Sequence, residues 1–389
     1  MRFLAGLSLL TSISISCIPA QANQQPGLLG VSLSLQNAFI DLLPEQPTIP
    51  PPPAPSPRLV IYVQTFTDTA GRRLSLLPLL EHDTKVTHVI LGSVHLHEKP
   101  GVIMLNNEPL SSDIHDYVWR EVKILQEHGV KVLALLGGAA PGTYSRLSAD
   151  DAEFEGYYRP LVNLIKTYRL DGLDVDIEEK VPLSTPIRLL RRLAADLGPS
   201  FLLTMAPLAT ALSDEKGDDL SGFSYQALDR LATIPSITTT SLSTNAGTSN
   251  DTKLISWYNA QFYGGYSRST YMYDSIVYAG IDPSRLVMGV TTSAAGYPNG
   301  FTPLKKLLGT VRELKEKYGN SFGGVSGWEY WDAGSGDRDM GMQVGGEPWR
   351  WLQRVAKAVH GAEDEVRGRG RKSMAFNGEC LRKCIRGNQ

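Results

Sequence analysis

The chain has 389 residues, which is enough to bury a large core and more than a minimal single domain needs. Its 38 Lys and Arg residues nearly balance its 40 Asp and Glu residues, and the formal net charge is -2. This balance gives no support for a nucleic-acid-binding protein, which normally presents a basic surface.

Residues 1–22 have the pattern of a secretory signal peptide. Arg2 precedes an apolar stretch over residues 3–18, and Pro19-Ala20-Gln21-Ala22 supplies a small-x-small cleavage site. We therefore expect cleavage after Ala22 and a secreted, extracellular protein. The stretch is short and rich in serine for a membrane anchor, and no later apolar segment has the length of a membrane span, so we expect no membrane partner.

The cysteines and one glycosylation pattern add little about the core. Cys17 lies within the expected signal peptide, and Cys380 and Cys384 lie near the end of the chain. A local bridge between these two and a pair of free thiols both fit their spacing. Asn250-Asp251-Thr252 is an N-glycosylation acceptor pattern that secretion would make usable.

Composition divides the rest of the chain into three parts. Residues 23–57 are rich in proline, most densely over residues 50–57, and predict an extended leader or linker. A globular body is expected over residues 58–360. Residues 361–389 carry acidic and then basic clusters and predict a flexible, solvated tail, although binding to an acidic surface is the alternative.

The globular body alternates short apolar runs with helical patterns. The expected strands are 59–64, 88–95, 130–136, 173–178, 201–205, 255–263, 286–291 and 324–329. Helical spacing marks 118–125, 154–165, 190–197 and a last helix that starts at Pro348. Eight such units over about 300 residues predict an α/β protein with a (β/α)8 TIM barrel, whose catalytic groups lie at the C-terminal strand ends.

A doubly wound open sheet is the structural alternative. It would favour a Gly-x-Gly-x-x-Gly turn after the first strand, and no such turn is present there. Gly137-Gly138 follows the third expected strand instead. Two glycines alone are a weak signal for a nucleotide site.

The fourth expected strand carries a row of acids. Asp174, Asp176 and Glu178 alternate with apolar residues, so in a strand the three carboxyl groups share one face. Close carboxylates oppose one another's ionisation, and partial burial disfavours the charged form, so at least one of the three should keep its proton at unusually high pH. A solvated strand face is the structural alternative, but the apolar flanks favour a functional site.

The run Asp171-Gly172-Leu173-Asp174-Val175-Asp176-Ile177-Glu178 resembles the Asp-Gly-x-Asp-x-Asp-x-Glu signature of glycoside hydrolase family 18, the chitinases and endo-β-N-acetylglucosaminidases. The resemblance extends over residues 58–360. Further positions in the order of the barrel strands carry it: Tyr62, Gly137-Gly138, Met205-Ala206-Pro207, Gln261-Phe262-Tyr263 and Trp328-Glu329-Tyr330.

Within the family the chain is most similar to secreted fungal endo-β-N-acetylglucosaminidases, and fungal chitinases share several of the same phrases. The segments that carry this similarity are 58–62, 137–142, 220–225, 257–263 and 327–330.

The resemblance implies substrate-assisted catalysis, in which the 2-acetamido oxygen of the sugar attacks its own anomeric carbon. Glu178 would be the general acid and later the base. Asp176 would hydrogen-bond the acetamido N–H, and Asp174 would share or exchange a proton with Asp176, so the three titrate as a group. Tyr263 would hydrogen-bond the acetamido oxygen.

The resemblance also implies substrate contacts around the sugar. Trp328 would form the apolar floor under the ring, and Gln261 would contact the same sugar. The remaining substrate-binding positions are Tyr62, Gly138 and Met205. One departure is Leu135, where related sequences with a Ser-x-Gly-Gly pattern have a serine, so a hydrogen bond that supports the buried Asp is missing or supplied elsewhere.

We therefore expect a retaining endo-β-N-acetylglucosaminidase that cleaves the GlcNAc-β-1,4-GlcNAc core of N-linked glycans, as a monomer and without metal or organic cofactor. A chitinase acting on chitin or chito-oligosaccharides is the first alternative. A glycan-binding protein without turnover is the second, and the presence of Glu178 argues against it. A metal hydrolase using His95, His97 and Asp116 is the third, but their spacing fits no familiar site.

Overall fold

The computed structural model describes residues 57–68, 71–214, 220–234, 251–295, 300–334 and 346–361. Several features expected from the sequence lie outside these ranges: the signal peptide, the proline-rich leader through residue 56, Asn250, the three cysteines and the charged tail after residue 361.

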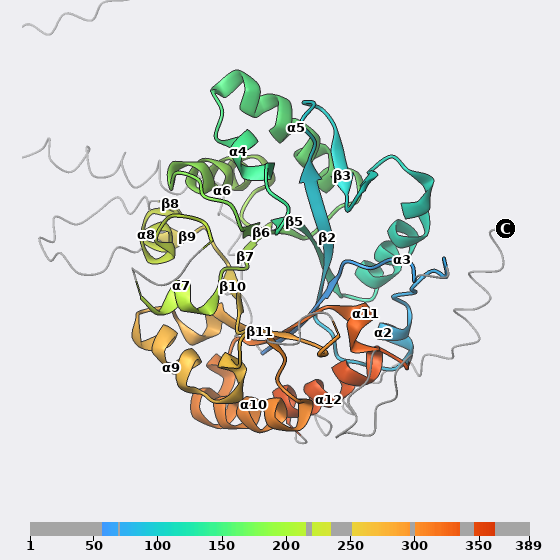
Figure 1. Ribbon diagram of the computed structural model, residues 1–389, viewed down its shortest axis with the longest axis vertical. Coiled ribbons are helices and arrows are strands. Elements are labelled where there is room, and N and C mark those ends of the chain that lie inside the picture. Colours follow the sequence, from blue (N-terminus) through green and yellow to red (C-terminus); the bar gives the residue numbers. More distant parts are fainter. Residues whose placement is uncertain are drawn as a thin grey trace, which may run out of the picture. The chain divides into compact units, whose positions relative to one another are not determined.

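Eight parallel strands close into a barrel (Figure 1). In chain order they are β1 (Arg58–Val63), β2 (His88–Leu96), β5 (Lys131–Gly138), β6 (Gly172–Ile177), β7 (Leu202–Met205), β10 (Trp257–Gln261), β11 (Leu286–Thr291) and β12 (Gly324–Trp328). Each strand pairs with its neighbours in the chain order of the barrel, and β12 pairs with β1, which closes the ring. The (β/α)8 TIM barrel expected from the sequence is confirmed.

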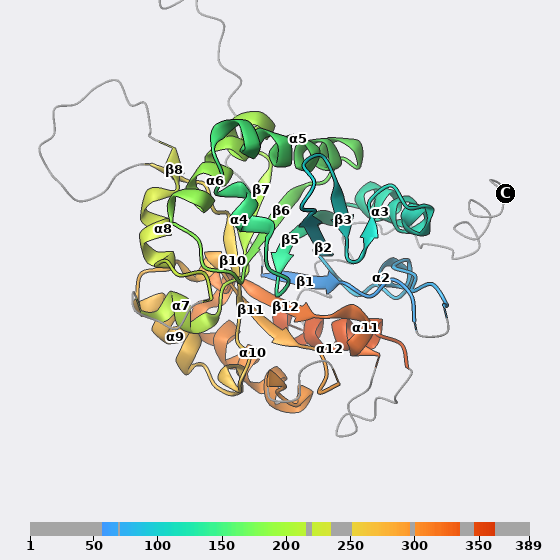
Figure 2. The ribbon, with the colours of Figure 1, turned by 45° about the horizontal axis from the view of Figure 1, so that its top comes forward.

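Helices surround the ring of strands (Figure 1, and turned in Figure 2). The longer ones are α3 (Asp116–Glu127), α5 (Asp151–Thr167), α6 (Ser184–Leu197), α9 (Tyr271–Tyr278), α10 (Leu304–Tyr318) and α12 (Trp349–His360). Shorter ones are α2 (Pro78–Glu81), α4 (Thr143–Leu147), α7 (Ala209–Ser213), α8 (Tyr225–Leu231) and α11 (Tyr330–Ala333). No helix in the described ranges combines the length and the apolar character that crossing a membrane requires.

All eight expected strands are present, with ends that differ by a few residues. The largest difference is at β10, expected over 255–263 and observed as Trp257–Gln261, so Tyr263 lies just beyond the strand. The helices marked by apolar spacing are α3, α5 and α6, and the last helix, α12, has Pro348 at its N-cap.

One insertion was not expected from the sequence. After β2 the chain forms a short antiparallel hairpin of β3 (Ile103–Leu105) and β4 (Glu108–Pro109), and β3 pairs with the end of β2. Asn106 occupies the turn with φ 54°, in the left-handed region that asparagine tolerates better than most residues. A second small pair, β8 (Thr233–Ile234) and β9 (Thr252–Lys253), precedes β10.

Alternation along the strands separates two apolar layers. On β6, Leu173, Val175 and Ile177 face outward into the large core between strands and helices. The smaller inner cluster fills the barrel from seven buried residues: Val60, Tyr62, Ile90, Leu133, Leu135, Trp257 and Val287. The acidic face of β6 therefore points into the barrel, above this inner plug, as the period of two predicts.

Candidate active site

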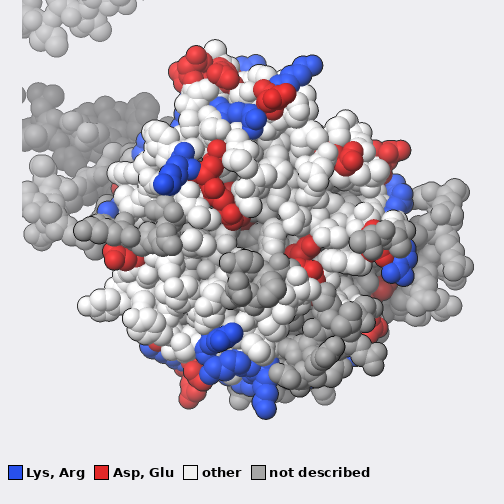
Figure 3. Space-filling model, viewed as in Figure 1, with Lys and Arg blue, Asp and Glu red and all other residues white. Residues whose placement is uncertain are grey.

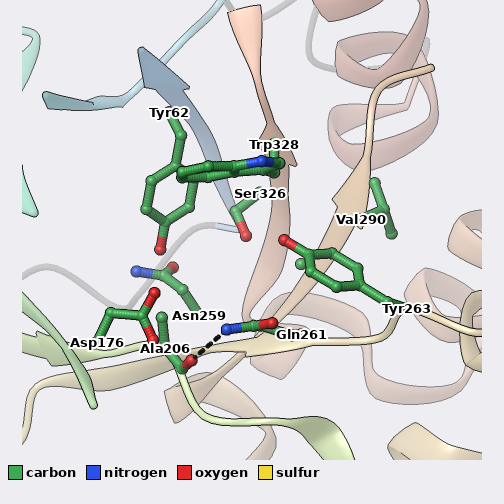
Figure 4. Close-up of a pocket in the computed structure, with 10 residues that line it drawn as sticks. Tyr62, Asp176, Ala206, Asn259, Gln261, Tyr263, Val290, Ser326 and Trp328 are labelled. Atoms are coloured by element: carbon green, nitrogen blue, oxygen red, sulfur yellow. Dashed lines mark hydrogen bonds between the residues drawn. The ribbon is translucent and has the colours of Figure 1, made fainter. Parts of the chain in front are cut away.

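A cavity opens at the C-terminal ends of the barrel strands, where (β/α)8 enzymes place their catalytic groups (Figure 4). Its lining residues come from β1, β6, β10, β11, β12 and the residues that follow β7 and β10: Tyr62, Asp176, Ala206, Asn259, Gln261, Tyr263, Gly289, Val290, Ser326 and Trp328. Segments distant in the sequence thus contribute to one site.

Asp174 lies below the cavity and is fully buried. Its carboxylate accepts hydrogen bonds from the Tyr62 hydroxyl at 2.8 Å, from Asn259 Nδ2 at 3.0 Å and from the Thr204 hydroxyl. Burial raises the pKa of Asp174, and these three hydrogen bonds oppose the rise because they favour the charged form.

The hydrogen bonds to Asp174 replace the one that a serine at position 135 would give. Leu135 pairs in register with Asp174 on the neighbouring strand, but its aliphatic side chain belongs to the inner apolar cluster. Thr204, in register on the other side, supplies a hydroxyl instead. The support that a serine would give at position 135 therefore comes from the opposite neighbour and from β10.

Asp176 is 6% exposed, and within the described ranges its carboxyl group, unlike that of Asp174, has no side-chain hydrogen bond. Burial raises the pKa of Asp176 well above its usual range, and the charges of Glu178 and Asp174 raise it further. The carboxyl that keeps its proton, expected somewhere in the row, is therefore best assigned to Asp176.

The two glycines at the end of β5 allow the chain to pass close to Asp176. Gly137 has φ 91°, and a Cβ there would lie 2.4 Å from the Asp176 carbonyl oxygen. A Cβ on Gly138 would lie 3.8 Å from Asp176 Oδ2. Gly137-Gly138 is thus a close-packing element of this site and not a nucleotide-binding turn.

Glu178 lies one residue past β6 and is partly exposed. Gln261 Nε2 donates to Glu178 Oε1 at 3.3 Å. It also donates to the Ala206 carbonyl at 2.9 Å, the bond drawn in Figure 4. Gln261 was expected as a substrate contact. The structure also places it as the residue that holds the carboxyl group of Glu178.

Tyr263 and Trp328 lie on the same side of the cavity (Figure 4). Trp328 ends β12, and its indole lies 5.4 Å, centroid to centroid, from the Tyr62 ring. Met205, expected to contact substrate, is instead fully buried in the outer core because its neighbour Thr204 takes the inward position. Ala206, the next residue, lines the cavity.

Four residues near the site were given no role in the sequence-based predictions, although Asn259 and Glu329 lie in segments that carry the family resemblance. Thr204 and Asn259 bind Asp174, Ser326 lines the cavity, and Glu329 holds the end of β1. Because side chains alternate between the two faces of a strand, the positions of the first three in β7, β10 and β12 predict that they point into the barrel. Each lies one or two positions from a residue that was already predicted for the site.

Glu329 is 4% exposed and binds the segment after β1. Its Oε2 accepts from the backbone N–H groups of Gln64 at 2.7 Å and Thr65 at 2.9 Å, and its Oε1 accepts from the Thr65 hydroxyl at 2.5 Å. Burial raises the pKa of Glu329, and these hydrogen bonds oppose the rise. Glu329 directly follows Trp328, so these hydrogen bonds connect the end of β12 to the segment that follows β1.

The described residues do not form the metal site considered as an alternative. Across the described ranges, no three His, Cys, Asp or Glu side chains lie close enough together to hold a metal ion, His95, His97 and Asp116 included. His97 Nδ1 instead accepts from the Lys99 backbone N–H at 3.1 Å.

Comparison with known proteins identifies the family of the chain. Residues 58–333 match the family model described as Glycosyl hydrolases family 18. A fungal endo-β-N-acetylglucosaminidase of that family has a similar structure, with 36% sequence identity, 78% of this chain and 98% of that chain covered, and a TM-score of 0.67. A search of curated proteins gave no match.

Chitinases are also similar. Chitinase ChiC from Aspergillus fumigatus is 37% identical, with 78% of this chain and 100% of that chain covered and a TM-score of 0.63. A chitinase from Pseudoalteromonas aurantia, at 18% identity, with 77% and 99% covered and a TM-score of 0.55, supports the fold alone. Since the family model covers most of the chain and two relatives match over nearly their whole lengths, the chain belongs to glycosyl hydrolase family 18 and is a glycoside hydrolase.

Proposed function

We propose that the chain is an endo-β-N-acetylglucosaminidase that cleaves the GlcNAc-β-1,4-GlcNAc core of N-linked glycans by a retaining, substrate-assisted mechanism. One observation carries the proposal: the acidic row has a partly exposed end, Glu178, backed by two buried acids. The pKa of both is raised, and that of Asp176 lies well above its usual range. A protonated, buried carboxyl is a poor nucleophile. The nucleophile is therefore better supplied by the substrate's own acetamido oxygen.

In the first step Glu178 donates its proton to the glycosidic oxygen, and the leaving sugar departs with that proton. The acetamido oxygen attacks the anomeric carbon as the glycosidic bond breaks, which gives an oxazolinium ring. Tyr263 donates its hydroxyl hydrogen to the acetamido oxygen before the attack and orients it. In the second step Glu178, now a carboxylate, takes a proton from water as the water opens the ring with net retention.

The positive charge of the intermediate calls for a negative charge at Asp176. Asp176 accepts the acetamido N–H, and its own proton passes to Asp174 as positive charge develops. Tyr62, Thr204 and Asn259 allow Asp174 to ionise in the free enzyme, so it can receive that proton. No metal or organic cofactor is needed for these steps.

The substrate assignment follows the similarity to the fungal endo-β-N-acetylglucosaminidase, whose TM-score of 0.67 is above the 0.63 of the fungal chitinase. Chitin and chito-oligosaccharides are the second candidate, because the fungal chitinase is 37% identical over its whole length. On the face that holds the cavity mouth, the charged side chains near the middle are acidic and the basic ones lie toward the periphery (Figure 3), which gives no sign of a site for an anionic ligand.

The deciding experiment incubates the protein separately with a high-mannose glycoprotein and with chitohexaose. We expect the glycoprotein to keep one GlcNAc on asparagine, identified by mass spectrometry of its peptides. Cleavage of chitohexaose alone would instead establish a chitinase.

A Glu178→Gln variant separates an enzyme from a glycan-binding protein. Loss of the general acid should lower the rate by about 10²–10⁴-fold while glycan binding persists. Unchanged turnover in this variant would remove Glu178 from the mechanism.

We also propose that the protein is secreted, on the signal-peptide pattern of residues 1–22. When the full chain is expressed in a secreting host, we expect the protein in the culture medium to begin at Asn23, which N-terminal sequencing would show. Retention in the cell with Met1 intact would contradict this proposal.

A further inference from the structure

Two buried hydroxyl groups on neighbouring strands lack a hydrogen-bond partner within the described part of the chain. They are Ser326 Oγ on β12 and Thr291 Oγ1 on β11, in side chains 1% and 3% exposed. Only Ser326 also lines the cavity, and its hydroxyl points toward the space between the other lining residues (Figure 4). A buried hydroxyl aimed into a binding cavity indicates a polar ligand atom.

The strand beside Ser326 leaves room at this point. Gly289 pairs in register with Ser326, and a Cβ at position 289 would lie 3.1 Å from Ser326 Oγ and 2.5 Å from the Ala260 carbonyl oxygen. Any side chain here would therefore close the space next to the hydroxyl. We call this space, bounded by Gly289 and Ser326 in the wall of the cavity, the acyl recess.

Two other polar lining groups, on Asn259 and Tyr62, already have partners. Asn259 donates to Asp174 and accepts from Trp257 Nε1 at 2.9 Å, and the Tyr62 hydroxyl donates to Asp174. Neither donates to Ser326. A buried hydroxyl without a partner destabilises the site, so water or a ligand atom should occupy the recess when the site is in use.

The proposed function brings the N-acyl group of the substrate to this part of the cavity. With the acetamido N–H at Asp176 and its oxygen at Tyr263, the acyl carbon lies between two lining residues, and the methyl group points away from the sugar ring. A methyl group cannot hydrogen-bond Ser326, whereas an added hydroxyl could replace a water there and keep its hydrogen bond.

We propose that Ser326 and Gly289 make the site accept N-acyl groups that end in a hydroxyl, so that N-glycolylglucosamine is accepted beside N-acetylglucosamine at the cleavage point. Ser326 is then a specificity-determining residue for the acyl group. This inference rests on the proposed function, because the acyl group reaches the recess only if Asp176 and Tyr263 hold the acetamido unit.

The test uses thiazoline analogues of the oxazoline intermediate, which do not react. Their ring carbon carries methyl, hydroxymethyl or ethyl, and each is made with a Man-β-1,4 or a GlcNAc-β-1,4 cap so that either glycan class is represented. Calorimetry gives Kd for the native chain, Ser326→Ala and Thr291→Val. Thr291→Val is the matched control, since it removes the other unpartnered hydroxyl outside the cavity lining.

We expect the native chain to bind the hydroxymethyl compound at least as tightly as the methyl compound and to bind the ethyl compound more weakly. The Kd ratio of hydroxymethyl to methyl should rise roughly tenfold in Ser326→Ala and stay unchanged in Thr291→Val.

Two outcomes overturn the inference while leaving the proposed function intact: rejection of hydroxymethyl as strongly as ethyl by the native chain, or the same ratio in Ser326→Ala. If no thiazoline binds with either cap, substrate assistance itself fails, and the acyl recess loses its ligand.

Discussion

At the scale of single residues, Gln261 was predicted to contact substrate, and in the structure it also hydrogen-bonds Glu178. One of its amide hydrogens is fixed by the Ala206 carbonyl, and the other is donated to Glu178 Oε1. An amide N–H cannot accept a proton, so the acidic proton of Glu178 is directed to Oε2. Gln261 is in this sense a positioning residue for Glu178, the proposed general acid.

Replacing Gln261 with Met keeps the volume and removes both donated hydrogen bonds. Because only a poor leaving group needs protonation, we expect kcat/KM to fall about 10–100-fold for oligosaccharide leaving groups and about threefold or less for 2,4-dinitrophenyl glycosides. Gln226→Met on α8, away from the cavity, is the matched control. Equal losses on both substrate types would restrict Gln261 to substrate binding.

Asp176 should lower stability at neutral pH. Its pKa is raised in the folded chain, so the folded state holds a proton that the unfolded state releases above about pH 4. The free energy of unfolding therefore falls as the pH rises from there through the folded pKa.

Asp176→Asn removes this dependence and should raise Tm at pH 7 by at least about 2 °C, or roughly 1 kcal/mol, with activity lost. The gain should shrink toward zero near pH 4. Scanning calorimetry across this pH range measures both quantities, and a gain that is constant with pH would show that Asp176 is not protonated in the folded chain.

The residues of the acidic row could be predicted because a strand alternates with a period of two, which places Asp174, Asp176 and Glu178 on one face. Thr204 and Asn259 could not be paired with Asp174 in the same way. Their contacts depend on the register between separate strands, which the spacing within one strand does not contain.

At the scale of elements, Glu329 and Asn106 connect β12, the segment after β1 and the hairpin β3–β4. Glu329 accepts from the N–H groups of Gln64 and Thr65, and Asn106 Nδ2 donates to the Gln64 carbonyl at 2.8 Å. Asn106 Oδ1 also accepts from the Ser93 N–H at 2.7 Å. The hairpin thus braces the rim of the cavity beside Tyr62 and Trp328.

Glu329→Ala should leave two part-buried N–H groups unpaired, each at a cost of roughly 1 kcal/mol, and so destabilise the chain by about 2 kcal/mol. Since Glu329 directly follows Trp328, we also expect KM to rise more than kcat falls. Urea denaturation and steady-state kinetics check both effects. Glu329→Gln, which keeps one acceptor oxygen, should recover most of KM; if KM is native in both variants, the contact is purely structural.

Elements with strong apolar runs were predictable, and those held by tertiary contacts were not. The hairpin β3–β4 has strands of three and two residues, too short for a periodic pattern. The helix α10 does carry a helical pattern, in Leu304, Leu307, Leu308, Val311 and Leu314, all of them buried. This apolar spacing is sufficient to predict a helix, although α10 was not among the expected ones.

At the scale of the whole molecule, the contacts of the last helix, α12, indicate that the folding unit extends to its end. The family match stops at residue 333, but α12 (Trp349–His360) lies beyond it and packs against β1, β12 and α10. Gly327 makes room for the Trp351 ring, because a Cβ there would lie 2.8 Å from it. The barrel closes between β1 and β12, the two strands that α12 covers.

We predict that a chain of residues 57–361 keeps the Tm of the full protein and keeps its kcat/KM within about twofold. It contains every strand and helix that the structure describes. A chain that ends at residue 347 loses six buried apolar residues of α12, of which the large ones are Trp351, Leu352, Val355 and Val359. At about 1.5–3 kcal/mol each, their loss removes roughly 6 kcal/mol or more, which is comparable to the total stability of a typical domain. Circular dichroism should therefore show the shorter chain largely unfolded at 37 °C, and a folded, active protein ending at 347 would make α12 an accessory and place the boundary at the family match.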